Sequence, residues 1–220
     1  MRQILFVFVA LIGLGVLLSL GFWQLQRLSW KEGLIAQADA MMLQEPVALP
    51  AALDPVKDRY RPVYAQGRFT GEETYVLTSK REWGAGFLII SAFETEDGRR
   101  ILIDRGFVPE AAKAVIRQKV EARIVGNLNW PDDMTPSTPA YDAKAEIWFG
   151  RDLVNIAKLL GTEPVMIIAR EETGDGITPM PASAQFKNDH LGYALTWFGL
   201  AFVWAGMTLA WLLRIRRRKV

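Results

Sequence analysis

The chain of 220 residues carries 26 Lys and Arg against 24 Asp and Glu, a net charge of +2, and half of it is hydrophobic. This length suits one modest soluble domain plus two membrane spans. There is no cysteine and a single histidine, His190, so disulfides, thiolate metal sites and cysteine nucleophiles are excluded. Most multi-histidine metal sites are excluded too, and a Ser-His-Asp triad would have to include His190.

The first apolar run predicts a transmembrane helix over residues 1–27. Residues 4–23 hold no charge across 20 positions, and at about 1.5 Å per residue they can cross a hydrocarbon core of about 30 Å. We expect this helix to be retained, because it exceeds the apolar core of about 7–15 residues in a signal peptide and no A-x-A-like cleavage site follows. No Arg- and Ser-rich leader precedes it, so no transit peptide is expected. Helical spacing over residues 28–42 predicts an amphipathic continuation.

Beyond a linker marked by Pro46, Pro50 and Pro55, short apolar runs predict a β-rich domain within residues 28–189. The expected strands are 61–69, 74–78, 87–93, 100–107, 121–128 and 165–169. A turn ending at Gly98 predicts a hairpin, residues 132–140 predict a loop, and residues 152–160 predict a short helix that ends at Gly161. The pattern therefore predicts an α+β domain dominated by antiparallel strands, and it leaves open whether the sheet is a small barrel or a bent sheet.

A second apolar run predicts a transmembrane helix over residues 190–213, with no charge across the 23 positions 191–213. A basic tail, 214–220, follows it, whereas residues 28–189 carry 19 Lys and Arg against all 24 Asp and Glu. Basic residues accumulate on the cytoplasmic side, so we expect both termini in the cytoplasm and a periplasmic middle domain, in a bacterial inner membrane. The tail is short and abuts a span, so we expect it to orient the chain in the lipid bilayer rather than to bind nucleic acid. The predicted fold class is an α+β membrane protein with two transmembrane helices flanking an antiparallel-β-rich extracytoplasmic domain.

The middle domain offers few catalytic candidates. It has no G-x-S-x-G, Walker-type or G-x-G-x-x-G motif. Asp132 and Asp133 indicate a solvated turn rather than an acid–base pair. Asp104 and Arg105 indicate ion pairing rather than a reactive site. We predict no catalytic residue and a protein that is not an enzyme.

The second span carries two series of residues spaced by seven. One consists of His190, Trp197, Trp204 and Trp211, and the other of Gly192, Gly199 and Gly206. Seven residues make two helical turns, so each series forms one stripe, and an offset of two residues, about 200°, sets the stripes on opposite faces. Because glycines let helix backbones approach closely in membranes, we predict that the glycine stripe packs on the first span and that the His/Trp stripe points away.

His190 itself has two interpretations. In the simpler one it is an interfacial residue wetted by headgroups, with Tyr193 and Trp211 in the aromatic belts of the bilayer. In the other it is an axial ligand of haem iron, and the macrocycle lies along aromatic side chains. The residues alone leave both open.

Several segments resemble the surfeit-locus assembly factors of cytochrome c oxidase. At the two ends these are Gly21-Phe22-Trp23-Gln24-Leu25-Gln26-Arg27 with Trp30-Lys31, and Asn188-Asp189-His190-Leu191 with Tyr193-Ala194-Leu195-Thr196-Trp197-Phe198. Between them are Tyr60-Arg61-Pro62-Val63 with Gly67 and Phe69, Asp104-Arg105-Gly106-Phe107-Val108-Pro109, and Trp148 with Asp152. The resemblance covers nearly the whole chain, and the motif at the second span is the most specific. Phe107 departs from the family, which usually has Trp there, and this bears only on a local packing or contact role.

The resemblance implies a bacterial member of this family: a non-enzymatic assembly factor for haem-copper oxidase that assists delivery or insertion of haem a into the catalytic subunit. The partners it implies are oxidase subunit I and haem a synthase, and haem a is the transient cofactor. It also implies that His190 ligates the haem iron. We further predict Tyr193 and Trp197 as ring contacts, and Trp23 and Arg27 as residues that close the pocket, with Arg27 pairing with a propionate. The alternative is a haem-free scaffold that stabilises an intermediate of subunit I.

Overall fold

The computed structural model describes residues 2–81, 83–117, 119–182 and 188–217. These residues form two compact units, one made of Met1–Gln37 with Ala184–Val220 and the other of Ala38–Ser183. Positions 183–187 of the predicted middle domain and positions 218–220 of the predicted basic tail lie outside the described residues.

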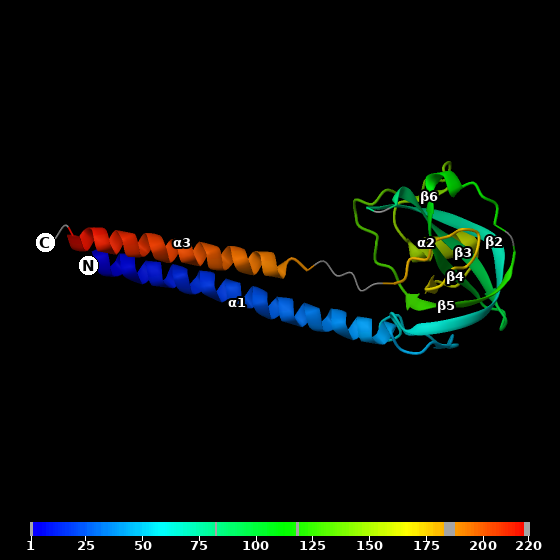
Figure 1. The fold of residues 1–220 in the computed structure, drawn as a ribbon, viewed down its shortest axis with the longest axis horizontal. Helices are drawn as coiled ribbons and strands as arrows, with labels where there is room; N and C mark the ends of the chain where they lie inside the picture. Colours follow the sequence, from blue (N-terminus) through cyan, green and yellow to red (C-terminus); the bar gives the residue numbers. More distant parts are fainter. Residues whose placement is uncertain (1, 82, 118, 183–187, 218–220) are drawn as a thin grey trace. The chain divides into compact units, whose positions relative to one another are not determined.

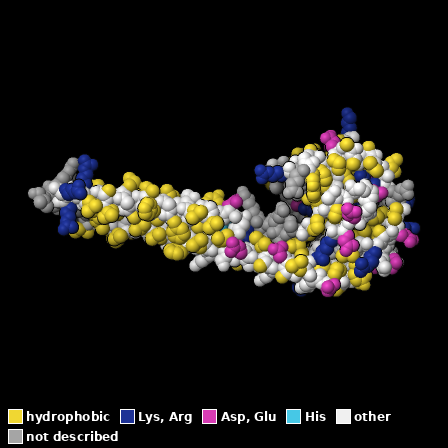
Figure 2. All heavy atoms as spheres, viewed as in Figure 1, with side chains coloured by type: hydrophobic (Ala, Val, Ile, Leu, Met, Phe, Trp, Pro, Cys, Tyr) yellow, Lys and Arg dark blue, Asp and Glu magenta, His cyan; other side chains and the backbone are white. Residues whose placement is uncertain are grey.

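Two long helices make up the first unit: α3 (His190–Arg217), and α1 (Arg2–Met42) as far as Gln37 (Figure 1). Both are long and apolar enough to cross a membrane. Neither contains a proline, which would remove a backbone hydrogen bond and kink the helix. α1 continues through residues 28–42, as predicted, so the expected boundary after residue 27 falls inside one helix. Hydrophobic side chains cover the helix pair, and basic side chains gather at the end of α3 (Figure 2).

The two helices pack side by side and antiparallel. The rings of Phe6 and Trp211 have their centroids 3.8 Å apart, and those of Phe22 and Phe198 are 5.3 Å apart. The start of α1 therefore contacts the end of α3, and a later part of α1 contacts the beginning of α3, so the two helices run antiparallel. The small side chain of Ala201, only 3% exposed, is buried in this unit.

The prediction that the glycine stripe packs on the first span is wrong. A Cβ added at Gly199 would meet nothing within 4 Å, and the same holds for the other two glycines of the stripe. Instead the indole of Trp204 lies against α1, where its Nε1–H donates to the carbonyl oxygen of Ala10 at 2.9 Å. A Cβ at Gly13 would lie 3.0 Å from the same ring. An indole N–H in an apolar helix needs an acceptor, and the small residues of α1 leave room for the ring.

The second unit is a closed β-barrel. Its strands are β1 (Val47–Ala48), β2 (Pro62–Lys80), β3 (Gly84–Thr95), β4 (Arg100–Pro109), β5 (Glu121–Asn129), β6 (Ile147–Trp148) and β7 (Met166–Ala169). The order β2-β3-β4-β7-β5 closes on itself because β5 also pairs with β2. The two-residue strands β1 and β6 pair with β2 in parallel. The main sheet therefore has no free edges. Of the two alternatives left open by the sequence, the domain is the small barrel and not the bent sheet.

The sheet is mixed, so the prediction of an antiparallel sheet is corrected. β7 runs parallel to β4 and antiparallel to β5. The connection from β5 to β7 contains the helix α2 (Leu153–Leu160) and is long enough to bring β7 back alongside β4 in the same direction. The two strands predicted over 61–69 and 74–78 are one strand, β2, with an irregularity between Phe69 and Glu73, where Gly71 has a φ of 82°.

The helix α2 and the hairpin form as predicted. The side chain of Asp152 caps the start of α2, and Gly161 ends it in the left-handed conformation with a φ of 60°. The apolar face of α2 packs on residues of β3, β4 and β7. Gly98, with a φ of 82°, lies in the turn between β3 and β4. A one-turn 3-10 helix, Glu110–Ala112, follows β4 and was not predicted.

Asp104 and Arg105 each form an ion pair, but with a distant partner rather than with each other. Asp104 Oδ2 accepts from Arg151 Nη1 at 3.2 Å, and Arg105 Nη2 donates to Asp175 Oδ2 at 2.8 Å. Successive residues of a strand point to opposite faces, which separates the two side chains. Both are 2% exposed, and burial raises the pKa of the Asp104 carboxyl while Arg151 opposes that shift. These pairs tie the barrel wall to its loops.

Candidate functional site

The candidate site lies where α3 begins. His190 is the first residue of α3, and its Nδ1 lies 2.7 Å from Oε1 of Gln24 on α1. Gln24 is only 8% exposed, whereas the imidazole is half-buried. This hydrogen bond links the two helices where their motifs lie close together.

The other α1 residues predicted for the site lie next to Gln24. Trp23 is 51% exposed. The guanidinium of Arg27 lies over the ring of Trp30, 4.3 Å from its centroid. A guanidinium over the face of an aromatic ring is attracted by the ring quadrupole. The structure therefore places Arg27 one turn beyond Gln24, and its pairing with a propionate stays a prediction.

The α3 residues predicted for the site follow His190 by one and two turns. Tyr193 is 57% exposed and Trp197 is half-buried. The contact between the rings of Phe22 and Phe198 places this stretch of α3 beside the Trp23 to Arg27 stretch of α1. All five predicted residues thus lie where α3 begins beside α1, and the hydrogen bond between His190 and Gln24 also joins the two helices there.

Gln24 was not predicted as a site residue. The signal in the sequence was an amide within an apolar helix, since an unpaired polar group there is costly and usually finds a partner. Gln26, two residues further on, is exposed, so the two amides of the motif have different environments. Two residues correspond to about 200° around the helix, which explains why only one of them faces α3.

The donor set fits a haem better than a bare metal ion. Among the described residues there is no group of three or more His, Cys, Asp or Glu that could hold a metal ion. A haem macrocycle brings four nitrogen ligands of its own and asks the protein only for axial ligation. His190 can supply one such ligand, because Gln24 engages Nδ1 and none of the described residues hydrogen-bonds to Nε2.

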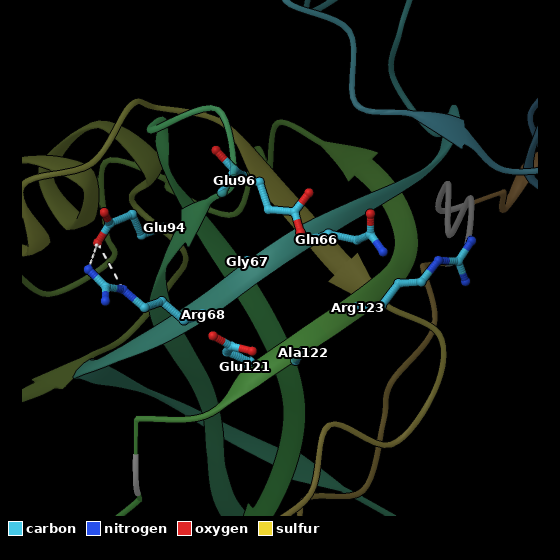
Figure 3. A pocket seen from close by; sticks show the side chains of 9 residues that line it. Gln66, Gly67, Arg68, Glu94, Glu96, Glu121, Ala122 and Arg123 are labelled. Carbon is cyan, nitrogen blue, oxygen red and sulfur yellow. Dashed lines mark hydrogen bonds and ion pairs between the residues drawn. The ribbon is translucent and has the colours of Figure 1, made fainter.

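A polar groove of about 520 Å³ lies on the barrel (Figure 3). It follows β2 between β3 and β5, and its charged side chains are Arg68, Glu94, Glu96, Glu121 and Arg123. Arg68 and Glu94 pair with each other at 3.0 Å, as the dashed lines in Figure 3 show. The other charged side chains of the lining, Glu96, Glu121 and Arg123, leave the groove with charges of both signs.

Fold and site together define a class of protein: two long apolar helices, tied by a histidine–glutamine hydrogen bond, with a closed mixed β-barrel in the chain between them. The chain belongs to the SURF1 family, whose family model matches residues 11–202. This range includes the motifs of both helices and the whole barrel. The family resemblance read from the motifs is confirmed.

Curated relatives cover most of the chain. Surfeit locus protein 1 of Homo sapiens is 32% identical over 210 residues, which cover 83% of this chain and 69% of the relative. The SURF1-like protein of Rickettsia felis is 33% identical over 207 residues, covering 88% of this chain and 90% of the relative. The SURF1-like protein of Rickettsia bellii is 31% identical over 222 residues, covering 93% and 88% respectively.

Proposed function

We propose that the protein is an assembly factor for haem-copper (cytochrome c type) oxidase, not an enzyme, and that it assists delivery or insertion of haem a into the catalytic subunit. The observation that carries this proposal is membership of the SURF1 family across both helices and the barrel. The partners would be oxidase subunit I, which receives the haem, and haem a synthase, which supplies it.

The proposed location is a bacterial inner membrane, with both termini cytoplasmic and the barrel periplasmic. Two helices long and apolar enough to span a bilayer support it. Arg214, Arg216 and Arg217 in the last turn of α3 support the orientation, because basic residues accumulate on the cytoplasmic side. The same inference places the start of α3, with His190, at the periplasmic end of its span.

In this proposal haem a is cargo, and its iron takes His190 as an axial ligand. Tyr193, Trp197 and Trp23 would lie along the macrocycle, and Arg27 would pair with a propionate. Tyr193 and Trp23 each expose more than half of their surface, so the site is open on the side of these rings. An open site suits a carrier, because its cargo must leave again.

The alternative proposal is a haem-free scaffold that stabilises an intermediate of subunit I. One observation favours it. Trp204 donates to the backbone of α1 and Trp211 lies against Phe6, so half of the His/Trp stripe is used in helix packing.

Complementation tests the proposed function. In a strain that lacks this protein, oxidase subunit I should be recovered with little haem a, and the wild-type gene should restore the haem content. His190→Ala should fail to restore it although the variant accumulates in the membrane. Full restoration by His190→Ala would favour the scaffold, and normal haem content in the deletion strain would contradict both proposals.

A further inference from the structure

We propose that Gln24 is a positioning residue that fixes the tautomer of His190, holding the proton on Nδ1 and leaving the lone pair of Nε2 available to a metal. The inference deepens the proposed function and rests on it for the identity of the metal, which would be haem iron. The tautomer follows from the hydrogen bond together with the orientation of the Gln24 amide, whose oxygen faces the ring.

The proton assignment follows from the atoms involved. Oε1 of Gln24 lies 2.7 Å from Nδ1 of His190, and an amide oxygen only accepts hydrogen bonds. The imidazole nitrogen must therefore be the donor. In a neutral ring a proton on Nδ1 leaves Nε2 unprotonated, and the neutral imidazole with a free lone pair is the form that binds metals.

The surroundings make this arrangement persistent. Gln24 is 8% exposed, so water competes little for its carbonyl oxygen. It lies within the long helix α1, and His190 lies at the start of α3, so both side chains stand on rigid elements. No described residue hydrogen-bonds to Nε2. Among the described residues, the ring is therefore held through Nδ1 alone.

Metal-binding histidines generally have this second contact. The ring nitrogen that does not bind the metal donates to an oxygen, which orients the ring and raises its basicity, and loss of such a partner typically lowers metal affinity about 10- to 100-fold. In free histidine the proton favours Nε2, which is the opposite tautomer. Gln24 would therefore correct the tautomer before the cargo arrives.

The chain offers a direct readout, because His190 is its only histidine. Full-length protein labelled with ¹⁵N-histidine and reconstituted in nanodiscs gives the signals of one imidazole, and protonated and unprotonated ring nitrogens have widely separated shifts. At about pH 8, wild type should show a protonated Nδ1 and an unprotonated Nε2. Gln24→Met, which lacks the acceptor, should shift the proton to Nε2. Gln24→Glu, which keeps an acceptor oxygen, should retain it on Nδ1.

Gln26→Met is the matched control, since Gln26 is exposed on the same turn of α1. A wild-type ring protonated on Nε2 would overturn the proposal. The Gln26→Met ring should keep its proton on Nδ1. If the Gln24→Met ring also kept its proton on Nδ1, the proposal would be overturned.

A second arm measures haem a retained by the same variants after co-expression with a haem a synthase. Retention should fall about 10- to 100-fold in Gln24→Met and recover in Gln24→Glu. Equal retention in Gln24→Met and wild type would overturn the positioning role while leaving the carrier function intact. If the tautomers were as predicted but neither the wild type nor any variant retained haem a, the pairing of Gln24 with His190 would be supported and the carrier function refuted.

Discussion

Two leucine substitutions test which face of α3 packs on α1. A Cβ added at Gly21 would lie 2.6 Å from the ring of Phe198, whereas one at Gly199 would meet nothing within 4 Å. Even for Cβ alone the ring would have to retreat by roughly 0.8 Å to reach ordinary contact at 3.4 Å. Gly21→Leu should therefore push the helices apart, and Gly199→Leu, the matched control, should not.

The size of the effect follows from the cost of overpacking. Extra methylenes in a well-packed site cost about 1–3 kcal/mol. Each 1.4 kcal/mol is a factor of ten in an equilibrium, so Gly21→Leu should lower the ratio of paired to unpaired helices about 5- to 140-fold. Both variants replace glycine by leucine within a helix, so the change in helix propensity is the same and cancels when the two variants are compared.

Cross-linking measures that ratio. The chain has no cysteine, so Phe6→Cys with Trp211→Cys introduces the only two thiols, at positions whose native rings are 3.8 Å apart. A short bismaleimide should link them in the parent and in Gly199→Leu, with a large loss in Gly21→Leu. A loss in Gly199→Leu as great as that in Gly21→Leu would refute the packing described above.

Three further variants probe the helix pair and the barrel. Trp204→Phe removes the indole N–H that donates to α1, and it should weaken helix pairing by about 0.5–1.5 kcal/mol in the same assay; unchanged cross-linking would contradict the role of that bond. Burial, and after it the charge of Glu73, raises the pKa of Tyr75 from 10.0 to about 12. Because the folded pKa lies above the unfolded one, this contribution to stability is complete below about pH 10 and is lost toward pH 12. In denaturant titrations between about pH 10 and pH 12, the unfolding free energy should fall less steeply with pH in Tyr75→Phe than in the wild type. The same slope in both proteins would contradict this role of Tyr75. Arg105→Lys removes the planar fork that donates to Asp175 and should lower the unfolding free energy of the barrel by about 1.5–3 kcal/mol, with exposed Arg81→Lys as the neutral control.

The elements that follow local rules were predictable from the sequence. Charge-free runs indicated both long helices, short apolar runs indicated the main strands, and Asp152 with Gly161 indicated the limits of α2. These signals depend on residues near each other in the chain. The closure of the barrel and the parallel pairing of β7 with β4 depend on where a long connection returns, which no local pattern encodes.

The stripes of α3 show where periodicity stops being informative. Spacing by seven correctly separates two faces, but it does not say which face meets α1. Small residues suggested the glycine face, whereas the contact pairs small residues of α1, Ala10 and Gly13, with the large ring of Trp204. The need of an indole N–H in an apolar helix for an acceptor accounts for this contact. Gln24 was missed for a related reason, since its role depends on a partner 166 positions away.

The most direct test of the proposed carrier function is a visible absorption spectrum of the detergent-purified full chain, co-expressed with a haem a synthase and compared with His190→Ala. The proposed function predicts a haem a band in the wild type that is lost or shifted in the variant. No band in either protein, although the membranes contain haem a, would contradict the carrier function and leave the scaffold. A band unchanged in His190→Ala would contradict ligation by this histidine.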